Sequence, residues 1–291
     1  MTATDTRRTS GRPNPLSRPE LLRHLLLIGM ASVMFYPLAW MISASLRDDS
    51  RINDPGLWPG ANFTADGYVT GFAGVGGVGF GQFILNSALV AAGCVIANVL
   101  ACSVTAYAFA RIDFRGRKVL FALMLGTLML PHHVVLIPQY LLFRELDWVN
   151  TYLPFIVPKL LATDAFFVFL LVQFFRALPR ELDEAARLDG CGHVAIFCRI
   201  ILPLAKPALA TTAIFSFIYS WNDFFTPLVY LTDTELYTVP LALRGFIDVN
   251  ANSAFGALFA MSVLSLLPVL GVFIAFQRLL VNGIATTGMR G

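Results

Sequence analysis

A polar segment between two apolar stretches has the composition of a surface that binds another molecule. Residues 181–203 read ELDEAARLDGCGHVAIFCRIILP. Within it, carboxylates flank the small residues Ala185 and Ala186, which would let the segment approach a groove in another protein closely. The chain has no HExxH or GxSxG motif and no paired catalytic carboxylates. The residue types therefore favour noncovalent docking over catalysis.

A second set of polar residues lies inside apolar stretches. Ionisable side chains in a membrane span are costly, so they usually face a cavity or a partner. Such groups could line a pathway for hydroxyl-rich solutes, which carboxylate, amide and imidazole groups can bind. Alternatively they pair with one another to hold helices together, for example Asp164 with a histidine. The candidates are His132, His133, Asp164, Trp221, Asn222 and Asp223.

The elements that must position these residues are membrane helices. The chain is 57% hydrophobic and 13% charged, with a mean hydropathy of +0.69, whereas soluble domains are about 25% charged. An all-α polytopic membrane protein is therefore predicted. The four cysteines form no CxxC pair, which favours reduced structural thiols over a metal or disulfide framework.

Six apolar stretches approach or exceed the roughly 20 residues that cross a bilayer as a helix. The first is predicted to be an uncleaved anchor, because its apolar run exceeds the roughly 7–15 residues of a signal peptide. The fourth stretch contains Lys159 and Asp164. It is counted as a span because otherwise the loops on either side of it would lie on the wrong sides of the membrane. Pro131 and Pro138 should kink the third. The predicted spans are 25–46, 84–110, 119–143, 153–175, 207–231 and 255–277.

The positions of lysine and arginine predict the orientation. They concentrate in residues 7–23, in residues 111–118, in residues 176–206 and near the C-terminus, and such basic loops stay in the cytoplasm. Both termini, a basic tail (residues 1–20) and the polar segment are therefore predicted to be cytoplasmic. The Gly- and Pro-rich stretch 47–83 is then an outer loop, either a linker or a contact for a partner.

Local signals predict a short helix over residues 181–189. Pro179 suits a helix start, and acidic residues in the first turn favour the positive end of the helix dipole. Gly190 suits the position that ends a helix. Leu182, Ala185, Ala186 and Asp189 then share one face, with Glu184 beside it.

A second helix is predicted over residues 193–201, ending before Pro203 because proline disfavours helix in the preceding residue. The two helices would meet at residues 190–192 and form an elbow that fits against a partner. An amphipathic helix lying on the membrane is the alternative, but its polar face should be rich in Lys and Arg.

The spacing of this segment resembles a known signature. The order EAA, three residues, Gly, nine residues, Ile-x-Leu-Pro is similar to the loop of permease subunits in binding-protein-dependent ABC importers. The segments AYAFARIDFRGRK, LIPQYLLF, SWNDFFTPL and FQRLLVNGIATTGMRG resemble the carbohydrate-uptake (maltose-type) branch. The matching residues of the loop are Glu184, Ala185, Ala186, Gly190, Ile200, Leu202 and Pro203, and Asp189 lies beside them.

The resemblance implies a type I ABC importer permease fold over residues 21–291, in which residues 177–206 hold the coupling helix. That helix docks on a separate ATPase, and Glu184 would make a charge-assisted contact there. The sequence contains no GxxxxGK[ST] loop, the usual cradle for ATP phosphates. The chain is thus expected to bind no cofactor or metal and to be no enzyme, with ATP-Mg held by the partner.

The implied partners are a second permease (a distinct homologue), two ATPase subunits, an extracytoplasmic solute-binding protein and membrane lipid, without nucleic acid. The location would be the cytoplasmic (inner) membrane of a bacterium or archaeon. The chain would form half of a pathway for a sugar or sugar-like solute.

Three alternatives remain open. The first is a permease for a non-sugar solute such as a glycerophosphodiester or an amino acid. The second is a proton-coupled secondary transporter with His132, His133, Asp164 and Asp223 as a relay, although such folds often show internal repeats that this sequence lacks. The third, an intramembrane enzyme, has no catalytic motif to support it.

Overall fold

The fold is helical throughout the part of the chain that is described. The computed structural model describes residues 18–52, 56–57, 63–247 and 254–287, where the extended pairing is a single bridge between Val75 and Val78. Four helices there are long and apolar enough to cross a membrane, or five if one bent pair counts as a span. The predicted all-α membrane fold is confirmed. The count of six spans and the cytoplasmic termini stay predictions, and residues 1–17 of the basic tail lie outside the described residues.

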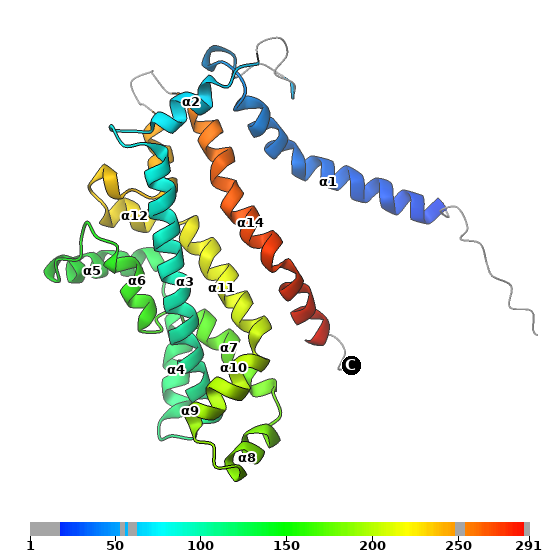
Figure 1. Ribbon diagram of the computed structural model, residues 1–291, viewed down its shortest axis with the longest axis vertical. Coiled ribbons are helices and arrows are strands. Elements are labelled where there is room, and N and C mark those ends of the chain that lie inside the picture. The colour runs from blue at the N-terminus through cyan, green and yellow to red at the C-terminus, as the bar shows by residue number, and fades with distance from the viewer. Residues whose placement is uncertain (1–17, 53–55, 58–62, 248–253, 288–291) are drawn as a thin grey trace, which may run out of the picture.

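Figure 1 shows how these elements are arranged. The α-helices are α1 (Arg18–Ala44), α2 (Asp66–Ala73), α3 (Phe80–Arg111), α4 (Arg117–Thr127), α5 (His132–Glu145), α6 (Leu153–Leu160), α7 (Ala165–Ala177), α8 (Glu181–Leu188), α9 (His193–Ile196), α10 (Leu202–Leu204), α11 (Lys206–Trp221), α12 (Phe225–Tyr230), α13 (Val239–Leu243) and α14 (Phe255–Thr287). Short turns of 3-10 helix are η1 (Asp49–Arg51), η4 (Thr234–Leu236) and η5 (Arg244–Phe246), and η3 (Phe197–Ile201) is a π-helical turn.

Helix α3 runs through the middle of the molecule and packs against α6, α7 and α11 (Figure 1). Its interior contains no proline, so the backbone ladder is uninterrupted. Small side chains on its packed side let neighbouring helices approach closely, as in other membrane proteins. The small buried residues of α3 are Ser87, Ala91, Cys94, Ala97, Cys102, Ser103, Ala106 and Ala110.

Three predicted spans are interrupted. Residues 119–143 form α4 and α5, which are 11 and 14 residues long and each shorter than the roughly 20 residues of a continuous span. The break precedes Pro131, because proline disfavours helix just before it. Residues 153–175 form α6 and α7, yet Leu153–Ala177 together is long and apolar enough to span. Residues 207–231 form α11 and α12.

The first and last predicted spans are continuous helices. They match the apolar stretches Glu20–Ala44 of α1 and Phe255–Gln277 of α14. Helix α1 extends away from the other helices (Figure 1), and it meets α14 where the rings of Trp40 and Phe259 lie 5.3 Å apart. Its apolar side chains are exposed along most of its length, which suits contact with lipid.

The predicted outer loop 47–83 is partly folded onto α14. Helix α2 packs against α14, and a Cβ atom at Gly67 would lie 2.6 Å from the carbonyl oxygen of Gly256. The backbone N–H of Gly256 in turn donates to the carboxylate of Asp49. The glycines of this stretch therefore permit close packing there, beyond providing flexibility.

Candidate functional site

The polar segment folds as the predicted elbow, here defined as α8 through α10 (residues 181–204). It lies at the end of the molecule opposite α2 (Figure 1). Helix α8 begins with three acidic residues in its first turn, where they stabilise the positive end of the dipole. It ends one residue earlier than predicted, at Leu188, and Gly190 follows in the left-handed conformation with φ +81°. The N–H of Cys191 donates to the carbonyl of Ala186 at 2.9 Å, a bond that closes the end of the helix.

The prediction that the second helix stops before Pro203 is wrong. The helix continues from α9 through η3 into α10, and Pro203 lies in the first turn of α10. In η3 the N–H of Leu202 donates to the carbonyl of Phe197, five residues earlier. Widening of the turn accommodates a residue that lacks an N–H and whose ring would clash with the usual carbonyl.

The faces of α8 differ from the predicted ones. Ala186 is only 6% exposed and packs into a core with Ile196 and Ile201 of the elbow and Phe175 of α7, so it does not lie on an open docking face. Leu182, Glu184, Ala185 and Asp189 are exposed. Asp183 and Ala186, which are three residues apart and both buried, mark the inward side of α8.

The exposed side of the elbow includes bulky apolar residues. Leu188 is 90% exposed at the end of α8, and Val194 is 77% exposed at the start of α9. Of the other predicted residues, Ile200 and Leu202 are half-buried and Pro203 is exposed. Apolar side chains beside Glu184 on the end of a membrane protein form a surface suited to a protein partner.

A buried ion pair that sequence reasoning missed attaches the elbow to the helices. Arg111, the last residue of α3, places Nη1 3.1 Å from Oδ2 of Asp183, and the two side chains are 2% and 9% exposed. Its Nη2 donates to the carbonyls of Phe175 at 2.7 Å and Leu178 at 2.8 Å. The sequence could show only that Asp183 lies about one helical turn before Ala186, so that both share one side of α8; the structure shows that this side faces inward.

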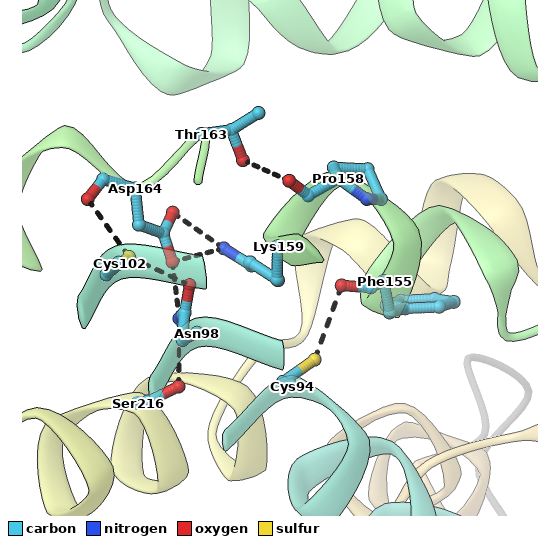
Figure 2. Close-up of polar contacts among 9 residues, drawn as sticks. All are labelled: Cys94, Asn98, Cys102, Phe155, Pro158, Lys159, Thr163, Asp164 and Ser216. Carbon is cyan, nitrogen blue, oxygen red and sulfur yellow. Dashed lines mark hydrogen bonds and ion pairs between the residues drawn. The ribbon is translucent and has the colours of Figure 1, made fainter. Parts of the chain in front are cut away.

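A second polar cluster lies where α6 and α7 meet α3 and α11 (Figure 2). Lys159 Nζ lies 2.8 Å from both carboxylate oxygens of Asp164. The amide of Asn98 donates to Asp164 Oδ2 at 2.6 Å and also contacts Ser216 Oγ at 2.9 Å. The expected partner of Asp164, a histidine, is thus replaced by lysine and asparagine, so the carboxylate is neutralised where burial would be costly.

The break between α6 and α7 creates this arrangement. Lys159 lies in the last turn of α6. Asp164 occupies the N-cap position of α7, but its side chain makes no capping hydrogen bond to that helix. Between them Ala162 adopts a left-handed φ of 54°, and the Thr163 hydroxyl donates to the carbonyl of Pro158 at 2.9 Å. This irregular turn interrupts the helix without reversing the chain, and it lets two side chains five residues apart face each other.

The histidines lie elsewhere. The ring of His133, near the start of α5, lies 5.0 Å from that of Phe225 in α12, and its side chain is exposed. The side chain of His132 lies outside the described residues, although its backbone begins α5. The structure therefore places His133 against α12 and Asp164 against Lys159.

The run Trp221, Asn222, Asp223 divides into different environments. Trp221 is 3% exposed, stacks on Phe217, and donates its indole N–H to the carbonyl of Ser265 in α14 at 3.1 Å. Asn222 is exposed and donates to the carbonyl of Ile218. Asp223 accepts from the N–H of Thr226 at 3.1 Å, at the turn between α11 and α12.

The sequence is similar to a family of transport proteins and to individual members of it. Residues 97–286 match the family model described as "Binding-protein-dependent transport system inner membrane component". An arabinooligosaccharides transport system permease protein of Halalkalibacterium halodurans is 36% identical, with 93% of this chain and 98% of the relative aligned. A trehalose/maltose transport system permease protein of Thermococcus litoralis is 32% identical, over 94% and 99%.

The fold also has a counterpart among solved structures. A chain of a bacterial ABC transporter involved in the import of the acidic polysaccharide alginate superposes with a TM-score of 0.77 at 23% identity. The match covers 91% of this chain and 99% of that one. At this identity the likeness concerns the fold.

Proposed function

The chain belongs to the family of inner membrane components of binding-protein-dependent transport systems, and from that premise we propose that it forms half of the translocation pathway of an ATP-driven sugar importer. As a family member it is a multi-pass membrane protein and a transport subunit. The complex would contain a second permease (a distinct homologue), two ATPase subunits holding ATP-Mg, and an extracytoplasmic solute-binding protein.

The elbow carries this proposal. The elbow lies at one end of the molecule (Figure 1). Its exposed residues include Glu184 and Ala185 and the apolar Leu188 and Val194. A short helix with an apolar side and a carboxylate suits a groove that has a basic residue at its edge. Because the sequence lacks the usual phosphate-binding loop, the groove would belong to a separate ATPase.

The sugar class rests on the relatives, whose names specify arabinooligosaccharides and trehalose/maltose. For the pathway, the half-buried Asp164 and Lys159, with side chains 24% and 32% exposed, and the exposed Asn222 offer donors and acceptors to hydroxyl groups. Asp223, His132 and His133 are further candidates. Trp221 is better assigned to packing against α14, because its indole N–H already has a partner there.

The polar cluster also bears on the proton-coupled alternative. Asp164 is bound by Lys159 and Asn98, and this accounts for a carboxylate at membrane depth without a relay. ATP-driven uptake does not require Asp164 to gain or lose a proton during transport.

Reconstitution tests the proposed function. The complex that copurifies with this chain is placed in proteoliposomes with its binding protein, and uptake of radiolabelled arabinotriose, maltose and trehalose is measured. We expect uptake of at least one sugar that requires ATP on the ATPase side and withstands a protonophore. Uptake that is independent of ATP and is abolished by the protonophore would instead support secondary transport. ATP-driven uptake of a non-sugar solute alone would contradict the sugar class.

A further inference from the structure

Three elements meet at one buried side chain, that of Arg111. Its guanidinium reaches α8 through Asp183 and the end of α7 through the carbonyls of Phe175 and Leu178, while its own backbone ends α3. Phe175 lies in the last turn of α7 and Leu178 is its C-cap, where few backbone donors remain for the carbonyls. The Phe175 carbonyl also accepts the N–H of Leu178, so Arg111 adds a second bond there.

We propose that Arg111 is a positioning residue that makes α8, α3 and α7 move as one body when the elbow is displaced. The inference rests on the proposed function, in which a partner ATPase displaces α8. Contacts that resist sliding carry the displacement of one helix to its neighbours. At Arg111 these are the buried ion pair with Asp183 and the two charge-assisted hydrogen bonds to the end of α7, in addition to the apolar packing around them.

Arginine suits this role because its planar guanidinium presents several donors at fixed angles, so one side chain can bind a carboxylate and two carbonyls together. Lysine offers one nitrogen and could not hold the same three oxygens with this geometry. Burial strengthens these contacts, since water does not compete with them. Among the described residues, the contact with Asp183 is an ion pair at 3.1 Å and the two contacts with α7 are hydrogen bonds.

A second arginine–aspartate pair nearby provides a matched comparison. Arg117 and Asp113 form an ion pair just beyond the end of α3, but the Asp113 side chain is 86% exposed and both residues belong to the same short stretch. Pairs with an exposed partner contribute little. Arg117 also donates to the carbonyls of Ile112 and Ala110 at the end of α3, and these bonds lead to neither α7 nor α8. Changes to it should leave the movement of α8 unaffected.

The direct test measures whether α8 and α3 move together in the complete transporter. Spin labels carried by unnatural amino acids replace Glu181 on α8 and Val104 on α3, both exposed, and their separation is measured by pulsed electron paramagnetic resonance with and without ATP. In the otherwise unchanged protein we expect the distance between the labels to be insensitive to ATP. In Asp183→Asn we expect an ATP-dependent shift, and in Asp113→Asn none.

Uptake per ATP hydrolysed provides the second readout. Asp183→Asn removes the ion pair with α8, and Arg111→Lys weakens the attachment to α7. For each variant we expect the ratio to fall at least about tenfold, the effect of losing one buried charge contact or one charge-assisted hydrogen bond. ATP hydrolysis and copurification of the ATPase should remain. Arg117→Lys should keep the original ratio.

The outcomes separate this inference from the proposed function. If neither Asp183→Asn nor Arg111→Lys changes the ATP response of the labels, Arg111 does not unite the three elements. If both variants lose ATPase copurification together with uptake, the residue is merely structural and the inference is overturned. If the original complex hydrolyses ATP but takes up no sugar, the proposed sugar class fails, and the label distances still decide the role of Arg111.

Discussion

The ammonium group of Lys159 lies 2.8 Å from both carboxylate oxygens of Asp164, across the break between α6 and α7. The pair is held from α3 by Asn98, which also reaches Ser216 on α11 (Figure 2). Four helices thus share one polar cluster. Such a cluster is stable only while every charge in it keeps a partner.

Lys159→Met should destabilise the chain by about 1–3 kcal/mol, because Asp164 would keep its charge and lose its cation. The double variant Lys159→Met with Asp164→Asn should recover part of that loss, since no unpaired charge remains. Thermal unfolding of the detergent-solubilised protein checks both, with the exposed Lys118→Met as control. A double variant less stable than Lys159→Met would contradict this pairing.

Glu184→Lys should reduce ATP-driven uptake at least about tenfold, because it replaces an exposed carboxylate expected to meet a cation of the ATPase by a like charge. Since Glu184 is exposed, the amount of chain in the membrane should not change. Uptake and copurification of the ATPase are measured. Glu181→Lys, in the same turn, is the matched control, and equal losses in both variants would show that the contact is not specific to Glu184.

Gly190→Pro should abolish coupling, because proline cannot adopt the φ of +81° at this position. Gly190→Ala should be milder, costing about 1–2 kcal/mol for a left-handed alanine. Nothing lies within 4 Å of a Cβ built at Gly190, so the effect comes from the backbone alone. Immunoblots of membranes together with uptake separate loss of coupling from loss of the chain; normal uptake by Gly190→Pro would exclude a fixed elbow.

Trp221→Ala should destabilise the chain by about 3–5 kcal/mol, as expected for a large buried aromatic. Trp221→Phe should cost less than Trp221→Ala because it keeps one aromatic ring. It loses the bond to the Ser265 carbonyl, about 0.5–1.5 kcal/mol, together with the packing of the second ring, and should keep its uptake.

The exposed neighbour provides the contrast. Asn222→Ala should leave thermal stability within about 0.5 kcal/mol and raise the solute concentration needed for half-maximal uptake if Asn222 lines the pathway. A Trp221→Phe variant that is stable but does not transport would instead place Trp221 in the pathway.

The helices and their ends could be predicted from the sequence, because they depend on residues close together in the chain. Apolar length predicted membrane helices, and proline, acidic residues and glycine predicted α8 within one residue of its observed end. The EAA–Gly–Ile-x-Leu-Pro spacing indicated the family that the comparisons then showed. In the same way, Pro131 explains why a predicted continuous span is two helices.

The tertiary structure alone decided which residues far apart in the chain form hydrogen bonds and ion pairs. Asn98 and Asp164 are separated by 66 residues, Asn98 and Ser216 by 118, and Arg111 and Phe175 by 64. Periodicity places Ala185 and Ala186 on adjoining positions of α8, but which of them faces inward depends on the core formed with α3 and α7. The physical reason is that the type of a residue determines which kind of partner can stabilise it, whereas the packing of the helices determines which distant group becomes that partner.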